Sequence, residues 1–240
     1  MYIEQLAIVL LCTIIQNLFG VGILVFGTPI LLGLGYDYLQ VLGVLCPASL
    51  AVSMVQILTI KDAKVPEKKM LLQSGMGVII GVGLLSVFVV PTFIYAVTAV
   101  TMFLAGALRL NKSFQKKVHG FLTMPKLHFY FANGVFHGFS NLGGILLVLK
   151  HNLDAAHKNQ SLMHTACVYL VYVVLQIFVL CLSGNADLFL HGLLISPFVV
   201  LFSVVFGRKP LASFSQKHMD LALGVFFVSA GAVLSYKIAH

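Results

Sequence analysis

The chain has 240 residues, of which 60% are hydrophobic and only 9% are charged. Soluble domains carry about 25% charged residues, so this composition, with a mean hydropathy of +1.02, excludes the soluble enzyme classes. The net charge of +8 does not indicate nucleic-acid binding, because no basic domain lies outside the apolar segments. We therefore expect a multi-pass membrane protein whose Lys and Arg residues collect in cytoplasmic loops.

Eight apolar segments follow one another along the chain, and most approach the ~20 residues that a spanning helix needs. They cover residues 4–34, 38–60, 70–90, 91–109, 127–150, 161–183, 188–206 and 218–238. The sequence thus predicts an all-α polytopic membrane protein with a single membrane domain, residues 1–240. Its two similar four-segment halves, about 1–110 and 127–240, are joined by a basic cytoplasmic loop at 111–126.

The first and fifth apolar segments contain residues that interrupt a helix. Glycines and Pro29 weaken the first segment, where we expect a break at residues 17–22. Glycines and polar residues also cluster in the fifth segment, whose two limbs, roughly 127–137 and 142–150, are each too short to span a membrane. Paired, interrupted hydrophobic segments in the two halves of a chain are typical of a transporter's binding site.

Positive charge favours a re-entrant fifth segment. Simple alternation of eight spans places ten of the 15 basic residues on one side and five on the other. If segment 127–150 returns to the side it entered from, the count becomes fourteen against one, with only Lys237 outside. If segment 4–34 is re-entrant too, the halves are inverted repeats and both termini lie outside. The alternative is a plain eight-helix bundle with kinked first and fifth helices.

No Asp or Glu lies deep in an apolar segment, which argues against a carboxylate proton relay or a cation site. Lys and Arg are also missing from the segment centres, so a bound anion would be held by backbone N–H groups and neutral donors. The substrate-binding candidates are Asn17, Gly20, Gly22, Pro47, Ser49, His137, Ser140, Asn141, Gly143 and Gly144. Thr28 and Thr165 are further neutral candidates. Tight helix packing by the glycines, interhelical hydrogen bonding by the asparagines and a simple kink at Pro47 are the alternatives.

Histidine and cysteine do not form a recognisable reactive site. His137 and His164 are the only histidines that we expect inside the protein, whereas His119, His151 and His157 are placed in loops. The four cysteines lie in apolar runs without Cys-x-x-Cys spacing, which is typical of buried small hydrophobes. No nucleophile elbow, Walker motif or zinc-protease motif occurs. We expect no catalytic residue, no metal ligand and no cofactor.

The motif Gly20-Val21-Gly22 leads to Pro29, Pro47-Ala48-Ser49 follows, and Ser140-Asn141-Leu142-Gly143-Gly144 opens the second half. This pattern resembles the sulfite exporter TauE/SafE family of membrane permeases over nearly the whole chain. The resemblance implies two homologous halves, each headed by a glycine-rich motif. It also implies transport of a small sulfur-containing anion, such as sulfite, thiosulfate or an organosulfonate.

These observations predict a secondary transporter that moves a small anion by alternating access across the inner or plasma membrane. Its expected partners are the anionic substrate and the lipid bilayer, with no nucleic acid, and the sequence leaves homodimer formation open. Two alternatives belong to other classes. One is an anion channel, and the other is a membrane-embedded enzyme or assembly factor that uses histidine residues.

Overall fold

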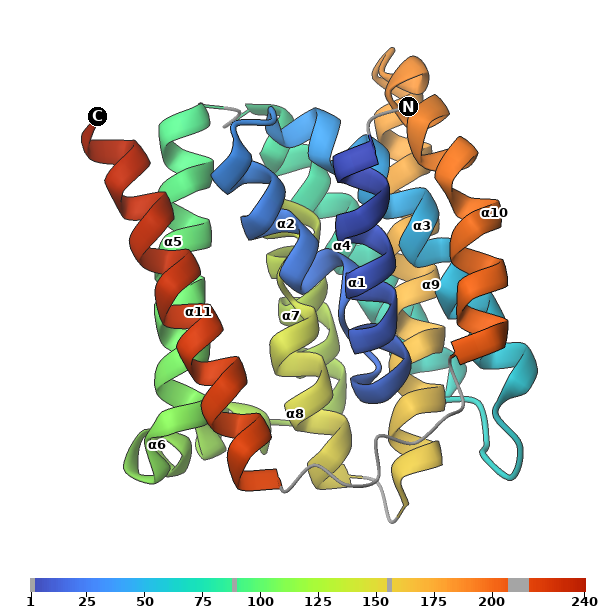
Figure 1. Cartoon of the computed structure of the whole chain (residues 1–240). Coiled ribbons are helices and arrows are strands. Elements are labelled where there is room, and N and C mark those ends of the chain that lie inside the picture. The colour runs from blue at the N-terminus through green and yellow to red at the C-terminus, as the bar shows by residue number, and fades with distance from the viewer. Residues whose placement is uncertain (1–2, 88–89, 155–156, 207–215) are drawn as a thin grey trace.

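The computed structural model describes residues 3–87, 90–154, 157–206 and 216–240, in which every regular element is helical. The helices are α1 (Ile3–Phe19), α2 (Ile23–Leu34), α3 (Tyr38–Thr59), α4 (Lys68–Val87), α5 (Pro91–Leu110), α6 (Lys112–Leu122), α7 (Lys126–Ser140), α8 (Gly144–Asp154), α9 (Lys158–Leu182), the 3-10 turn η1 (Ala186–Leu188), α10 (Phe189–Phe206) and α11 (Gln216–Ala239). Figure 1 shows them as a bundle. We call the end that carries both termini the upper end, and the end that carries α6 the lower end.

Six helical stretches among the described residues are long and apolar enough to cross a membrane. They are α3, Lys68–Leu85 of α4, α5, α9, η1 with α10, and Leu221–Ala239 of α11. Pro91 occupies the first turn of α5, where its missing N–H costs no hydrogen bond. The prediction of a multi-pass, all-α membrane protein is confirmed at this level.

Each of the two interrupted apolar segments forms a pair of short helices. The first breaks at residues 20–22, between α1 and α2, and the second at 141–143, between α7 and α8. Each leading helix runs three residues further than predicted, to 19 instead of 16 and to 140 instead of 137. The reason is that each of these helices ends where the backbone becomes left-handed, which happens at Gly20 and at Asn141, with φ of +80° and +64°.

Each pair of short helices returns to the end of the bundle from which it started (Figure 1). The first hairpin, α1 with α2, opens at the upper end. The second hairpin, α7 with α8, opens at the lower end. These four helices have 17, 12, 15 and 11 residues, and none is a candidate span. The fold of the described residues is therefore six long helices with two broken hairpins, not eight continuous helices.

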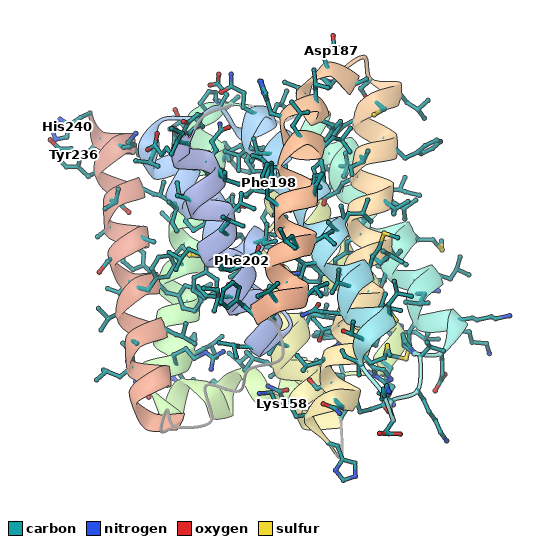
Figure 2. All side chains as sticks on the ribbon, turned by 45° about the vertical axis from the view of Figure 1, so that its right-hand side comes forward. Lys158, Asp187, Phe198, Phe202, Tyr236 and His240 are labelled. Atoms are coloured by element: carbon teal, nitrogen blue, oxygen red, sulfur yellow. The ribbon has the colours of Figure 1, made fainter. Side chains whose placement is uncertain are left out.

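Basic residues gather at the lower end. The loop between α3 and α4, helix α6 and the connection from α8 to α9 all lie there (Figure 1), and they carry Lys61, Lys64, Lys117 and Lys158. Figure 2 shows Lys158 at the lower end, whereas Asp187 and Tyr236 lie at the upper end. For the described residues, this distribution agrees with a re-entrant segment 127–150, which was expected to place fourteen basic residues on one side of the membrane and one on the other.

The basic connector at 111–126 is not a simple loop, because it contains the helix α6. Asn111 Oδ1 accepts hydrogen bonds from the N–H groups of Ser113 (2.9 Å) and Phe114 (3.2 Å), which caps the first turn. Leu122 is buried and Lys117 is exposed, so α6 has one apolar face and one polar face. This amphipathic pattern was not recognised in the sequence, because lysines dominate the segment.

Glycine pairs hold α4 and α7 in close contact. A Cβ on Gly81 would lie 3.0 Å from Gly138 Cα, and a Cβ on Gly134 would lie 3.1 Å from Gly77 Cα. Gly77 and Gly81 on α4, like Gly134 and Gly138 on α7, are four residues apart and therefore share one helix face. This packing fixes α7, and with it the second break, against a long helix of the first half.

Candidate functional site

The first break is closed by a side chain from α1. Gly20 ends α1, and its N–H donates to Gln16 O at 2.8 Å. A Cβ on Gly22 would overlap the backbone of Cys12 and Gln16, so only glycine lets the returning chain lie against α1. Gln16 Oε1 accepts a hydrogen bond from Ile23 N–H at 3.1 Å and thereby caps α2.

The second break resembles the first. In each, a glycine lies against the residue six positions earlier, which is His137 in the second break and Gln16 in the first. Asn141 ends α7, and its N–H donates to His137 O at 2.7 Å. A Cβ on Gly143 would lie 2.6 Å from His137 Cβ, just as a Cβ on Gly22 would meet Gln16. Ser140 is satisfied locally, because its hydroxyl donates to Phe136 O at 2.6 Å and accepts from Leu142 N–H at 3.2 Å.

The two breaks meet in the interior of the protein. Asn141 Nδ2 donates to Thr28 Oγ1 at 2.9 Å, which joins the second break to the middle of α2. A Cβ on Gly144 would lie 2.9 Å from Val21 Cγ1, in the first break, and would overlap the hydroxyl of Tyr169. The pairing that the sequence predicted between the two glycine-rich stretches is therefore a contact in space.

Aromatic rings from α9 cover one side of the second break. The His137 ring is fully buried and stacks on Tyr172, with centroids 4.4 Å apart and planes at 24°. The Tyr169 ring stands edge-on to His137 at 5.4 Å. Tyr172 OH accepts a hydrogen bond from Asn133 Nδ2 at 3.0 Å, which fixes the ring against α7.

One face of α3 adds polar groups to the same region. Ser49, Ser53 and Gln56 follow each other at helical spacing and are buried. Gln56 Nε2 donates to Gln16 O at 2.9 Å, next to the first break. Further along this face, the Cys46 thiol lies 3.8 Å from Gln176 Oε1 on α9. The polar faces of α3 and α9 therefore meet beside the two breaks.

Many polar atoms in this region have no hydrogen-bond partner among the described residues. They are Gln16 Nε2, Ser49 Oγ, Ser53 Oγ, Gln56 Oε1, Asn133 Oδ1, both ring nitrogens of His137, Asn141 Oδ1, Tyr169 OH and Gln176 Nε2. We call these residues the central polar cluster. The Gln176 side chain is nonetheless close enough to His137 to interact with its imidazole. An unpaired buried donor or acceptor costs about 1–3 kcal/mol, so such a concentration in one place requires an explanation. None of its members carries a formal charge, and the groups able to donate outnumber the amide oxygens.

The ten predicted residues do not all belong to this cluster. Ser49, His137 and Asn141 do, and Gly22, Gly143 and Gly144 shape the breaks beside it. Gly20 faces α9, where a Cβ would lie 3.1 Å from Leu162 Cδ2.

Asn17 and Pro47 lie in contacts with α10. Asn17 Oδ1 accepts from Ser203 Oγ at 3.0 Å, an interhelical hydrogen bond. A Cβ on Gly192 of α10 would lie 2.8 Å from Pro47 Cγ and would also overlap Gly43 O, the carbonyl that Pro47 leaves without its helical N–H. Asn17 thus makes the interhelical hydrogen bond that was its alternative role, and Pro47 lies at a close contact between α3 and α10.

Six members of the cluster were not predicted from the sequence: Gln16, Ser53, Gln56, Asn133, Tyr169 and Gln176. One signal was present. Gln56 and Gln176 are 120 residues apart, close to the spacing between the two glycine-rich stretches.

His151 was placed in a loop, and this is wrong, because it is fully buried in α8. Its Nε2 lies 2.8 Å from Tyr130 OH and its Nδ1 lies 2.8 Å from Thr165 Oγ1. Thr165 donates its own proton to Ser161 O at 2.8 Å, so we assign the proton to Nδ1 and the acceptor role to Nε2. A loop was expected because the apolar pattern weakens here, but these partners satisfy the ring inside the bundle.

Histidines at the lower end do not assemble a metal centre. The rings of His151 and His164 are 5.5 Å apart, and His164 Nε2 lies 2.6 Å from Gln160 Nε2. Across the described residues, no three His, Cys, Asp or Glu side chains are grouped so that they could hold a metal ion.

A cavity of about 350 Å³ lies at the upper end, above the second break. Tyr36, Asp37, Tyr95 and Asn185 contribute polar groups to its lining. Tyr38 lies in its wall and is almost fully buried, and its hydroxyl donates to Phe139 O at 3.3 Å. Tyr38 therefore separates this cavity from the end of α7.

Comparisons with protein-family models, with curated proteins and with solved structures return no match. The resemblance to the TauE/SafE family stays a prediction that rests on the short glycine-rich and proline motifs. What the structure adds is the local geometry of the two breaks and of the polar groups around them.

Proposed function

We propose that this chain is a secondary transporter that carries a small anion across the membrane through the central polar cluster. The observation that carries the proposal is the concentration of unpartnered, uncharged polar groups where the two broken hairpins meet. A bound anion would accept hydrogen bonds from Gln16 Nε2, Gln176 Nε2 and the Tyr169 hydroxyl. It would thereby repay the cost of burying these groups.

The chemistry of the cluster favours an anion over a cation. Cations in proteins are held by carboxylates or by several carbonyl oxygens. No carboxylate belongs to the cluster, and its amide N–H groups and hydroxyls are the donors that an anion needs. Helix α8 begins at Gly144, where the Tyr169 hydroxyl occupies the position of a Cβ, so the positive end of its dipole lies beside this member of the cluster.

If the two halves are inverted repeats, the site can open to either side of the membrane. Several matched features support such a relationship between the halves. Gly20 corresponds to Asn141, and Gly22 corresponds to Gly143 in its contact with the residue six positions earlier. The first hairpin opens at the upper end and the second at the lower end (Figure 1), as a two-fold axis in the membrane plane requires. Rocking of one half against the other would expose the cluster alternately to each side.

The sequence is the basis for proposing which anion is carried and how the chain is oriented in the membrane. The resemblance to the TauE/SafE permeases favours a sulfur-containing anion such as sulfite, thiosulfate or an organosulfonate. The basic lower end would face the cytoplasm of a cell whose inner or plasma membrane holds the protein.

Flux measurements in proteoliposomes test the proposal. We expect saturable uptake of isotope-labelled sulfite, thiosulfate or a small sulfonate, and no comparable uptake of a monovalent cation. Flux that rises linearly with substrate concentration would indicate a channel instead. If none of these anions moves above the rate of empty liposomes, the proposed function fails for this substrate class.

Two variants test the site. Gln176→Leu and Tyr169→Phe each remove a donor from the cluster while retaining most of the side-chain volume. We expect flux to fall at least about tenfold in each, the equivalent of about 1.4 kcal/mol from one lost hydrogen bond. Asn159→Leu is the matched control, because Asn159 is exposed at the start of α9. Unchanged flux in both cluster variants would contradict the site assignment.

A further inference from the structure

A second cavity, of about 590 Å³, lies between α5, α6, α7 and α8. Apolar side chains line it almost entirely, among them Val97, Ala105, Ala132, Phe136 and Ile145. Its polar contributions come from Asn133 and Thr101. The Thr101 hydroxyl is already used, because it donates to Val97 O at 2.7 Å. A small anion in this cavity would find almost no hydrogen-bond donor.

The cavity opens on the membrane-facing surface of α5. Val100, Leu104 and Phe121 all line it, and they are exposed by 57%, 49% and 36%. Helix α5 packs chiefly against α11, and the pair stands to one side of the bundle (Figure 1). Because α5 is a candidate span, hydrocarbon surrounds this opening in a membrane. Acyl chains are the molecules with direct access to it.

Filling the cavity with hydrocarbon is favourable for a simple reason. Side chains around an empty apolar space lose dispersion contacts on that side, and an acyl chain restores them. Water gains little there, because it needs two to four polar partners.

Basic residues lie beside the lower end of this cavity, at the level expected for a lipid headgroup. Leu108 and Phe121 mark the lower part of the cavity wall. Arg109 follows Leu108 directly, and Lys117 precedes Phe121 by one turn of α6. Lys126 is exposed at the start of α7. A basic surface beside a bilayer attracts anionic headgroups.

We propose that this cavity binds one acyl chain of an anionic phospholipid from the leaflet at the lower end, with its headgroup beside Arg109, Lys117 and Lys126. The inference rests on the lining and on the charges around it, not on the transport function proposed above. The lipid would fill the space between α5 and the second hairpin.

Native mass spectrometry of the full-length protein tests the proposal, with phosphatidylglycerol and phosphatidylcholine of identical acyl chains as the probes. We expect one phosphatidylglycerol to be retained at least about fivefold more strongly than phosphatidylcholine, since each basic side chain near an anionic lipid contributes about that factor. The double variant Lys117→Gln/Lys126→Gln should reduce this preference to the contribution of Arg109. Equal retention of the two lipids by the unaltered protein would overturn the proposal.

A cavity-filling variant with a matched control tests the location. Ala132→Trp places an indole in the cavity, whereas Ala222→Trp adds the same volume on the exposed surface of α11. Retention should fall about fivefold or more in the first variant only, as expected when the acyl chain loses its space. Equal retention in both variants would overturn the proposal.

Photocrosslinking of the unaltered protein keeps the test independent of any folding defect. Phosphatidylglycerol with a diazirine in its acyl chain should label the cavity-lining segments at 132–136 and 142–146. Labelling confined to the exposed faces of α5 and α11 would also overturn the proposal.

Discussion

Asn141 and Thr28 form a buried hydrogen bond of 2.9 Å between residues that are 113 positions apart. Asn141 ends α7 with a left-handed backbone, and Thr28 lies within α2. Both side chains are fully buried. The contact therefore ties the second broken hairpin to the first, in the region where the central polar cluster lies.

Removing either partner should destabilise the protein, and the two effects should not add. Thr28→Val leaves Asn141 Nδ2 unpaired, at a cost of about 1–3 kcal/mol. Asn141→Gly removes the amide and keeps the φ of +64° accessible. In the double variant no donor is left without its acceptor, so its loss should be smaller than the sum. Thermal unfolding in detergent measures this coupling, and strictly additive losses would show that the bond contributes nothing.

Gly144 should not tolerate a side chain, because the Tyr169 hydroxyl occupies the position of its Cβ. We expect Gly144→Ala to lower the unfolding free energy by about 1–3 kcal/mol through overpacking. Adding Tyr169→Phe removes the overlapping oxygen and should restore part of the stability, although the ring carbon stays 2.7 Å from the new methyl group. Calorimetry on the three variants provides the test. An equally unstable double variant would mean that some other contact excludes the methyl group.

Close packing of α4 on α7 should make Gly138 intolerant of alanine. A Cβ there would lie 2.5 Å from Val78 O and 3.0 Å from Val82 N, which are backbone atoms that cannot rotate away. We expect Gly138→Ala to cost about 1–3 kcal/mol. Gly83 on α4 is the control, because a Cβ there meets nothing within 4 Å.

The control should be neutral or stabilising by up to about 1 kcal/mol, because alanine favours a helix over glycine. Both variants can be followed by thermal unfolding in the same detergent. Equal effects of the two substitutions would contradict a role for the α4–α7 contact.

Tyr38 should limit access from the upper cavity to the protein interior. Its hydroxyl bonds to Phe139 O, and Cys46, two turns further along α3, is fully buried. In a chain whose other cysteines are replaced by alanine, Tyr38→Ala should speed labelling of Cys46 by a membrane-impermeant thiol reagent. A factor of about five to ten corresponds to the roughly 1 kcal/mol of the lost hydrogen bond. Tyr236→Ala, an exposed position at the upper end, is the control and should leave the rate unchanged.

The returning course of the second hairpin can be tested in membranes. Cysteines introduced at Met124 and Asp154 flank this hairpin at the lower end and should be labelled from the same side. Asn185→Cys, between α9 and α10, should be labelled from the opposite side. Labelling of residues 124 and 154 from opposite sides would instead support the plain eight-helix bundle.

Much of the fold followed from composition and charge. Six of the eight predicted apolar segments form one long helix each. The other two, which contain the glycines and polar residues, form the broken hairpins. The start of each break was predicted three residues too early, because local propensity does not show which residue adopts the left-handed backbone. Helix α6 was missed because its lysines obscured a short amphipathic period.

Fewer of the site residues could be read from the chain. Asn141 and His137 could be predicted because they lie in or next to the second break, where a polar residue is conspicuous among glycines. Asn17 looked equivalent, but its side chain turns to Ser203 on α10. Helix periodicity gives each residue a direction around its own axis, but it does not say which neighbour stands there.

The sequence alone determined that this is a membrane protein, that two glycine-rich stretches interrupt its apolar segments, and that no Asp, Glu, Lys or Arg lies deep in those segments. These properties are local, since each depends on residue type and spacing. Only the tertiary structure decided that Val21 approaches Gly144, that Asn141 reaches Thr28, and that polar faces of α3 and α9 complete the cluster. Those contacts join residues more than a hundred positions apart, and they depend on how the helices pack.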